Sequence, residues 1–290
     1  MSSSSATTAV SGEDFLRGMA DSSRARVEAA RAVRALPQLR AAALAAPPAP
    51  PLTLSAEGFD LIAEVKLRSP AVGQLRGGDE DIVARVQSYA DAGAAAISVL
   101  TEPTRFDGEL SHLTQAATAL GERIPVMRKD FLVDPYQMYE ARLAGAGGAL
   151  VILRMLDHAA IDALLAAAAE LDLFVLLEAF DADDLRLAGQ LVSAFGEQQF
   201  LLVGVNCRDL TTLQVVPGRL EALAPLLPHD APTVAESGVT NAADAARLAA
   251  AGYDAALIGS ALMQSADAGR LVRELLEAGR AASVRPRTDG

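Results

Sequence analysis

The chain of 290 residues contains a single cysteine, Cys207, which excludes an intrachain disulfide and fits a reducing cytoplasm. No apolar run reaches the roughly 20 residues that a membrane-spanning helix needs. Residues 1–10 lack a basic segment followed by an apolar one, so we expect no signal peptide and a cytoplasmic protein. One cysteine and three scattered histidines (His112, His158 and His229) predict no zinc site, although counting leaves open a Mg²⁺ site of carboxylates.

Positive charge is scarce as well, because 25 Lys and Arg residues stand against 37 Asp and Glu residues, for a net charge of −12. An acidic overall field repels nucleic acid and anionic membranes, so we expect neither as a partner. A small anionic substrate stays compatible with this charge where backbone amides and a few cations hold it.

Lysine is rarer still: two of the 25 cations are lysines, Lys66 and Lys129, and the other 23 are arginines. One interpretation is a codon bias that replaces lysine with arginine wherever either side chain serves. The two remaining lysines would then mark positions where arginine does not serve, because lysine can exchange protons whereas arginine stays charged. We therefore expect at least one of them to be catalytic.

The order of apolar segments predicts an α/β fold. Short apolar, β-branched runs alternate with amphipathic segments rich in Ala, Leu, Arg and Glu, which is typical of parallel strands buried on both faces and joined by helices. Eight such units in about 230 residues favour a closed (β/α)8 TIM barrel over a doubly wound sheet. The predicted strands are 61–66, 95–100, 125–128, 149–153, 174–178, 201–206, 233–236 and 255–258.

The N-terminal part of the chain does not share this alternation. Residues 12–45 have Leu, Val and Met at helical spacing, and the four prolines within 47–51 end that pattern. We predict a disordered tail over 1–9, an N-terminal helical extension with a Pro-rich linker over 10–52, and the barrel over 53–290, which forms one domain with the extension.

Charged side chains gather at the carboxyl ends of the predicted strands, where barrels of this class have their active sites. Glu64 and Lys66 share one face of the first strand, Lys129 follows the third, and Glu178 ends the fifth. Later strands add Asn206, Arg208 and Glu236. Each glutamate by itself is equally explained as a structural partner of a lysine. Their collection at one rim favours an acid–base site, because opposite charges in a partly dry pocket separate pKa values.

Small residues follow the last two predicted strands, as Ser237-Gly238 and Gly259-Ser260. Backbone N–H groups at these positions would hold a phosphate, and the alternative is a pair of ordinary glycine turns. The pattern as a whole predicts a barrel pocket that binds a phosphorylated substrate and performs acid–base chemistry without a metal.

At these residues the chain resembles indole-3-glycerol-phosphate synthase, a barrel enzyme of tryptophan biosynthesis. The most specific matching stretches are Glu64-Val65-Lys66 with Ser69-Pro70, and Arg128-Lys129-Asp130-Phe131. Further matches keep the family's order across residues 61–263, and the N-terminal extension matches an extra segment of the family. The resemblance implies a carbon–carbon lyase, a decarboxylase without a cofactor. It would close the indole ring of 1-(2-carboxyphenylamino)-1-deoxyribulose 5-phosphate with loss of CO2 and water.

The resemblance also implies roles by matching position. Lys129 corresponds to a general acid, Glu178 to its partner base, and Lys66 to a second acid that pairs with substrate anions; which lysine acts at which step stays open. Glu64 and Asn206 correspond to positioning residues. The implied phosphate-site residues are Ser69, Ser237 (also counted as catalytic), Gly238, Gly259 and Ser260. The implied rim charges are Arg208, near the anthranilate carboxylate, and Glu236, and the implied apolar walls are Phe106, Phe131, Leu150, Leu210 and Ile258.

Some residues depart from the family's usual pattern without removing a proposed acid or base: Ala71, Phe180, Cys207 and Ala235. They leave open a paralogue with an altered substrate. A sugar-phosphate isomerase would require Cys or Asp at the end of the first strand, where this chain has Lys66. A non-catalytic barrel that binds a phosphometabolite would be favoured by loss of Lys129 or Glu178, and both are present. The resemblance leaves the oligomeric state as a monomer or a weak homo-oligomer.

Overall fold

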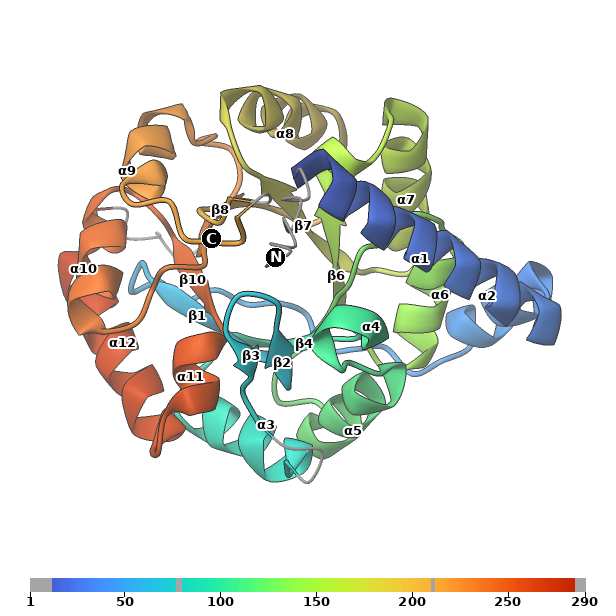
Figure 1. The fold of residues 1–290 in the computed structure, drawn as a ribbon, viewed down its shortest axis with the longest axis horizontal. Helices are drawn as coiled ribbons and strands as arrows, with labels where there is room; N and C mark the ends of the chain where they lie inside the picture. Colours follow the sequence, from blue (N-terminus) through green and yellow to red (C-terminus); the bar gives the residue numbers. More distant parts are fainter. Residues whose placement is uncertain (1–11, 77–79, 210–211, 285–290) are drawn as a thin grey trace, which may run out of the picture.

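Eight parallel strands close into a barrel (Figure 1). The structure is a computed structural model, and it describes residues 12–76, 80–209 and 212–284. Their order around the barrel is β1-β10-β9-β8-β7-β6-β5-β4. Each predicted strand agrees with the structure to within one residue at either end, so the (β/α)8 prediction is confirmed. The strands are β1 (Asp60–Val65), β4 (Ala96–Leu100), β5 (Val126–Lys129), β6 (Gly148–Ile152), β7 (Phe174–Ala179), β8 (Leu201–Asn206), β9 (Thr233–Glu236) and β10 (Ala255–Ile258).

Helices cover the outside of the barrel, and several begin at an Asp or Asn whose side chain accepts a hydrogen bond from a backbone N–H of the first turn. No helix of the described residues is long and apolar enough to span a bilayer. The helices after β1 are α3 (Ile82–Asp91), α4 (Pro103–Phe106), α5 (Leu110–Leu120), α6 (Tyr136–Leu143), α7 (His158–Glu170), α8 (Ala182–Phe195), α9 (Arg219–Leu223), α10 (Ala242–Ala250), α11 (Ser260–Gln264) and α12 (Ala268–Ala282), with 3-10 turns at Leu153–Met155 and Ala224–Leu226.

Alternate residues of the strands supply two separate hydrophobic cores. In β1, Leu61 and Ala63 belong to the core between the strands and the helices, whereas Ile62 belongs to the core inside the barrel. The side-chain period of a strand is two, so Glu64 lies on the same face as Ile62 and points to the barrel axis. The interior is therefore apolar at depth and charged at its upper layer.

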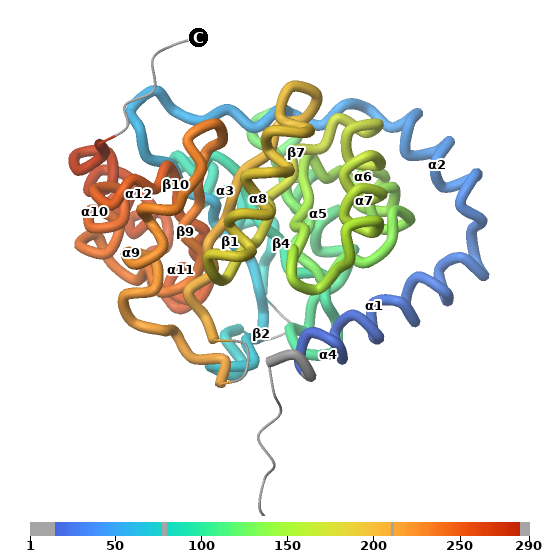
Figure 2. Tube along the Cα trace, turned by 90° about the horizontal axis from the view of Figure 1, so that it is seen from above, coloured from blue at the N-terminus to red at the C-terminus, as the bar shows by residue number. Residues whose placement is uncertain are grey.

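The N-terminal segment forms two helices, α1 (Gly12–Val33) and α2 (Leu36–Leu44), where the sequence pattern suggested one continuous helical stretch. Ala35 is extended and precedes α2, and Pro37 lies in the first turn of α2, where its missing N–H is tolerated. In Figure 2 the start of α1 lies at the same end of the barrel as α4 and the hairpin of β2 (Arg68–Ser69) and β3 (Gly73–Gln74). The sequence did not predict this hairpin. The predicted division at residue 52 stays a prediction, and the predicted tail lies outside the described residues.

An ion pair between a half-buried arginine and a fully buried aspartate joins α1 to the barrel directly beside Lys129. Arg26 donates from Nη1 and Nη2 to the two carboxylate oxygens of Asp130, at 2.8 and 2.7 Å. Thr101 Oγ1 donates to the same carboxylate at 2.8 Å. Burial alone would raise the pKa of Asp130, but the Arg26 hydrogen bond and the Arg128 charge outweigh it and lower this pKa to about 2. The position of α1 thus depends on the residue next to a candidate catalytic lysine.

We expect Asp130→Asn to lower the free energy of unfolding by about 3–5 kcal/mol near neutral pH, because removing one partner of a buried pair leaves arginine charge uncompensated. The pKa of Asp130 in the folded state lies below the ordinary aspartate pKa of 3.8. The carboxylate therefore stabilises the fold at pH values above 3.8 and loses this contribution as the pH falls toward 2. Urea unfolding of wild type and variant should therefore converge in that range. Arg24→Ala, which breaks an exposed pair with Asp21, is the control and should cost under about 1 kcal/mol. Equal losses in both variants would contradict a special contribution of Asp130 to stability.

Candidate active site

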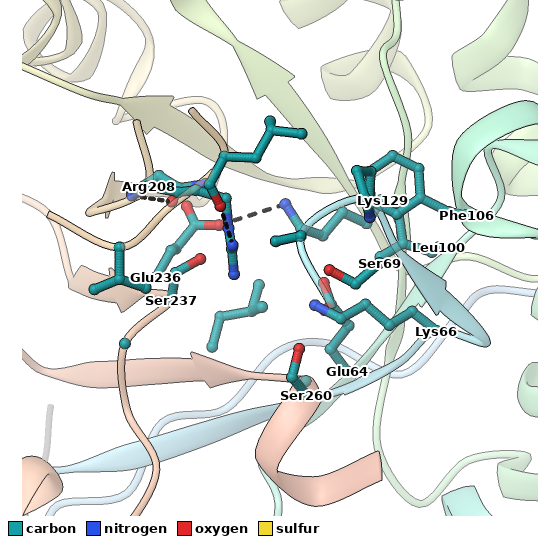
Figure 3. A pocket seen from close by; sticks show the side chains of 18 of the residues that line it. Glu64, Lys66, Ser69, Leu100, Phe106, Lys129, Arg208, Glu236, Ser237 and Ser260 are labelled. Carbon is teal, nitrogen blue, oxygen red and sulfur yellow. Dashed lines mark hydrogen bonds and ion pairs between the residues drawn. The ribbon is translucent and has the colours of Figure 1, made fainter. Parts of the chain in front are cut away.

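A cavity of about 380 Å³ opens at the carboxyl ends of the strands, and every barrel strand or its following loop contributes to its wall (Figure 3). Sixteen of the seventeen predicted site residues line it, and the remaining one, Leu210, lies outside the described residues. The sixteen are Glu64, Lys66, Ser69, Phe106, Lys129, Phe131, Leu150, Glu178, Asn206, Arg208, Glu236, Ser237, Gly238, Ile258, Gly259 and Ser260.

Lys66 and Glu64 form a close ion pair on one side of the cavity, with 2.5 Å between Nζ and Oε1. Both side chains are nearly buried, at 14% and 2% exposed. Gly259 permits this contact, because a Cβ at that position would lie 2.1 Å from Oε1 of Glu64 and 2.9 Å from Nζ of Lys66. The glycine after β10 therefore leaves space for the ion pair, which the sequence alone did not reveal.

Lys129 lies between two buried carboxylates, with its Nζ 3.4 Å from Oε1 of Glu178 and 3.5 Å from Oε2 of Glu236 (Figure 3). Burial alone would lower the pKa of Lys129, but the charges of Glu178, Glu236 and Glu64 outweigh burial and raise it. These charges favour the protonated form of Lys129, which is the form that can donate a proton.

Glu236 has the least exposed side chain of the three carboxylates in the site, at 1%. Neither of its oxygens has a hydrogen-bond partner within the described part of the chain. Burial raises the pKa of Glu236 well above its usual value, and the nearby charge of Glu178 adds to the effect. A Cβ at Gly204 would lie 2.1 Å from Oε1 of Glu236, so β8 must carry a glycine opposite this side chain.

Asn206 fixes the orientation of Glu178. Its Nδ2 donates to Oε1 of Glu178 at 2.9 Å, while its own Oδ1 accepts the backbone N–H of Arg208 at 3.0 Å. The guanidinium of Arg208 donates to the carbonyl oxygen of Leu213 and lines the cavity. One chain of hydrogen bonds therefore connects the loop after β8 to the carboxylate beside Lys129.

The ends of β9 and β10 form a side of the cavity with small residues. Ser237 and Gly238 have consecutive positive φ angles of 68° and 77°, which is unusual for a serine. A Cβ at Gly238 would lie 2.9 Å from Sγ of Cys207, so the turn also needs a glycine for space. The hydroxyl of Ser260 is buried and has no hydrogen-bond partner within the described residues. This side offers polar groups that a ligand could engage.

Aromatic and aliphatic side chains form the opposite side. The rings of Phe106 and Phe131 lie 6.0 Å apart, and Phe15 meets Phe131 edge to face at 5.9 Å. Phe15 and Leu16 belong to α1 and were not predicted, because only the docking of α1 brings them to the cavity. Other lining residues lie within one residue of a strand's carboxyl end and would have been found by applying the strand-end rule to apolar residues: Leu100, Ile152, Phe180 and Leu257.

The arrangement can bind a ligand that is anionic at one end and aromatic at the other, with two cations and three carboxylates between the ends. Among the described residues, no group of three or more His, Cys, Asp or Glu side chains is placed to hold a metal ion.

Comparisons with known proteins agree with this geometry. The sequence pattern of the family described as indole-3-glycerol phosphate synthase matches residues 16–275. An indole-3-glycerol phosphate synthase of Mycolicibacterium smegmatis is 42% identical over 264 residues, which are 88% of this chain and 91% of that protein. One from Rhodococcus opacus is 38% identical over 266 residues, covering 91% and 95%. The crystal structure of 3-hexulose-6-phosphate synthase from Salmonella typhimurium shares the fold alone, with a TM-score of 0.60 at 16% identity over 77% of this chain and 99% of that one.

The raised pKa of Glu236 predicts a pH dependence of stability. The protonated form of Glu236 stabilises the fold at pH values below the ordinary glutamate pKa of 4.5. This contribution is lost as the pH rises through the higher pKa that Glu236 has in the folded state. Glu236→Gln cannot ionise, so wild type should lose stability relative to this variant over that range. Urea unfolding at a series of pH values would measure the difference. The exposed Glu197→Gln is the matched control and should track wild type. Parallel curves for wild type and Glu236→Gln would contradict a raised pKa.

Proposed function

The chain belongs to the indole-3-glycerol phosphate synthase family of lyases in tryptophan biosynthesis, and on this premise we propose that Lys129, Lys66 and Glu178 perform the ring closure. The substrate would be 1-(2-carboxyphenylamino)-1-deoxyribulose 5-phosphate, and the products indole-3-glycerol phosphate, CO2 and water. The observation that carries the proposal is the position of the Lys129 ammonium between two buried carboxylates in the same cavity as Lys66.

The first step needs a general acid. Protonation of the substrate ketone oxygen by Lys129 makes the ketone carbon electrophilic, and the aromatic ring carbon then attacks it. The new carbon–carbon bond is balanced by the loss of CO2, whose electron pair returns to the ring. The position of Lys129 supports this role, because the carboxylates of Glu178 and Glu236, 3.4 and 3.5 Å from its Nζ, favour the protonated form that a general acid needs.

The second step needs an acid and a base together. The hydroxyl formed from the ketone leaves as water after it takes a proton, and a ring proton is removed to complete the indole. Glu178 accepts that proton in this proposal, which is supported by the hydrogen bond from Asn206 to its carboxylate, 3.4 Å from Lys129. Lys66 is the second acid in this proposal, and Glu64 holds it in position.

The two ends of the cavity give the substrate an orientation. The serines and glycines after β9 and β10, with Ser69 of the hairpin, would bind the phosphate. The aromatic ring would lie against Phe106, Phe131, Leu150 and Ile258, and Arg208 would face the anthranilate carboxylate. This orientation places the ketone between the two lysines.

The location, oligomeric state, cofactors and partners of the enzyme are also proposals. We propose a cytoplasmic monomer or weak homo-oligomer that acts without a cofactor, a nucleic acid or a membrane. The net charge of −12 and the single cysteine support this environment.

The purified protein should release CO2 and produce indole-ring absorbance from the carboxyphenylamino-deoxyribulose phosphate. If neither product formed, the proposed reaction would be refuted.

Lys129→Ala should lower kcat by about 10²–10⁴-fold, because general acid catalysis contributes that much. Lys129→Arg should be nearly as impaired, since the larger planar guanidinium keeps the charge but cannot present a proton at the position of the compact ammonium. Arg186→Ala on the exposed face of α8 is the control. Activity of Lys129→Ala within about tenfold of wild type, roughly 1.4 kcal/mol of barrier, would exclude Lys129 as the acid.

A further inference from the structure

Phe180 extends the apolar side of the cavity beyond the residues named so far. It is the first residue after β7, lies two positions after Glu178, is 3% exposed and lines the cavity. It shares a hydrophobic cluster with Phe131 and Ile152. In the closed strand order β7 lies across the barrel from β1, so Phe180 faces the side that carries Lys66.

Arg154, in the turn after β6, holds the Phe180 ring from outside the cavity. Its guanidinium carbon lies 4.7 Å from the centroid of that ring, within the range of a cation–π contact. The same guanidinium donates to Asp184 from Nε at 2.8 Å and from Nη2 at 2.6 Å. Arg154 is not among the residues that line the cavity, so the ring lies between the arginine and the cavity.

The backbone of Phe180 is held as firmly as its side chain. Its N–H donates to Oδ2 of Asp184 at 2.8 Å, which is the same oxygen that accepts both Arg154 hydrogen bonds. Asp181 also pairs with Arg154 and caps the start of α8. The ring of Phe180 therefore contacts Arg154 directly, and its main chain is held by the aspartate that pairs with the same arginine.

We propose that Phe180 determines which substituents the aromatic ring of the substrate can carry, and that Arg154 is a positioning residue that acts through Phe180. The proposal rests on the proposed function, since it concerns the anthranilate end of that substrate. A rigid wall excludes added bulk because a fixed ring cannot move aside. One methyl group in an apolar pocket changes kcat/KM by about 10–200-fold in known cases.

The test uses the full chain and compares the parent substrate with analogues that carry one methyl group at each free ring position. Phe180→Ala should lower kcat/KM for the parent, mainly through KM. At one ring position it should raise the methylated-to-parent ratio of kcat/KM by about tenfold or more. Phe180→Leu should give a smaller shift in the same direction and serves where the alanine variant does not fold.

Phe174→Ala is the matched control because Phe174 lies at the other end of β7, is 4% exposed, belongs to the same cluster and does not line the cavity. It should leave the ratio within about twofold of wild type, since its loss changes packing but not the pocket.

Arg154→Met removes the charge and keeps an apolar stem. We expect it to shift the ratio in the same direction as Phe180→Ala in the wild-type background and to have no further effect in the Phe180→Ala background, because coupled residues are not additive. An equal shift in both backgrounds would overturn the positioning role of Arg154.

A ratio that stays within about twofold at every ring position in Phe180→Ala would overturn the specificity role of Phe180. Absence of turnover of the parent substrate by wild type is a separate result, which refutes the proposed function instead.

Discussion

Charge balance inside an apolar barrel is the constraint on which this site depends. Three glutamates and two lysines enter one cavity from β1, β5, β7 and β9, and each charge is costly there unless a partner offsets it. Lys129 is shared between Glu178 and Glu236, while Lys66 pairs with Glu64. Burial and the neighbouring charge of Glu178 raise the pKa of Glu236, because three carboxylates share the cavity with two ammonium groups.

The backbone is adapted to this cluster and connects it to the rest of the fold. Gly204 and Gly259 leave the space that two of the carboxylates occupy. At the end of β5 the alternation of side chains sends Lys129 into the cavity and Asp130 outward to Arg26 of α1. The helix that supplies Phe15 to the apolar wall is therefore fixed by the neighbour of the lysine, so the charged and the apolar parts of the site are positioned together.

Much of the fold could be predicted from the sequence, because strands buried on both faces appear as continuous apolar runs with clear ends. The break between α1 and α2 was not predicted, since a helical pattern continues across Ala35, and a hairpin of two-residue strands has no periodicity to detect. The strand-end rule placed the charged residues correctly in the cavity. It could not place Phe15, whose position depends on the docking of α1. It also could not give the direction of the Lys129 pKa, which is set by competition between burial and three carboxylates.

A crystal structure of the protein with indole-3-glycerol phosphate bound would show which side chains contact the atoms that react. We expect the phosphate against Ser237, Gly238 and Gly259, and the indole ring against Phe131, with Lys129 within hydrogen-bond reach, about 3 Å, of a polar product atom. A product bound in the reverse orientation, or bound away from Lys129, would contradict the assignment of acid–base chemistry to this cluster.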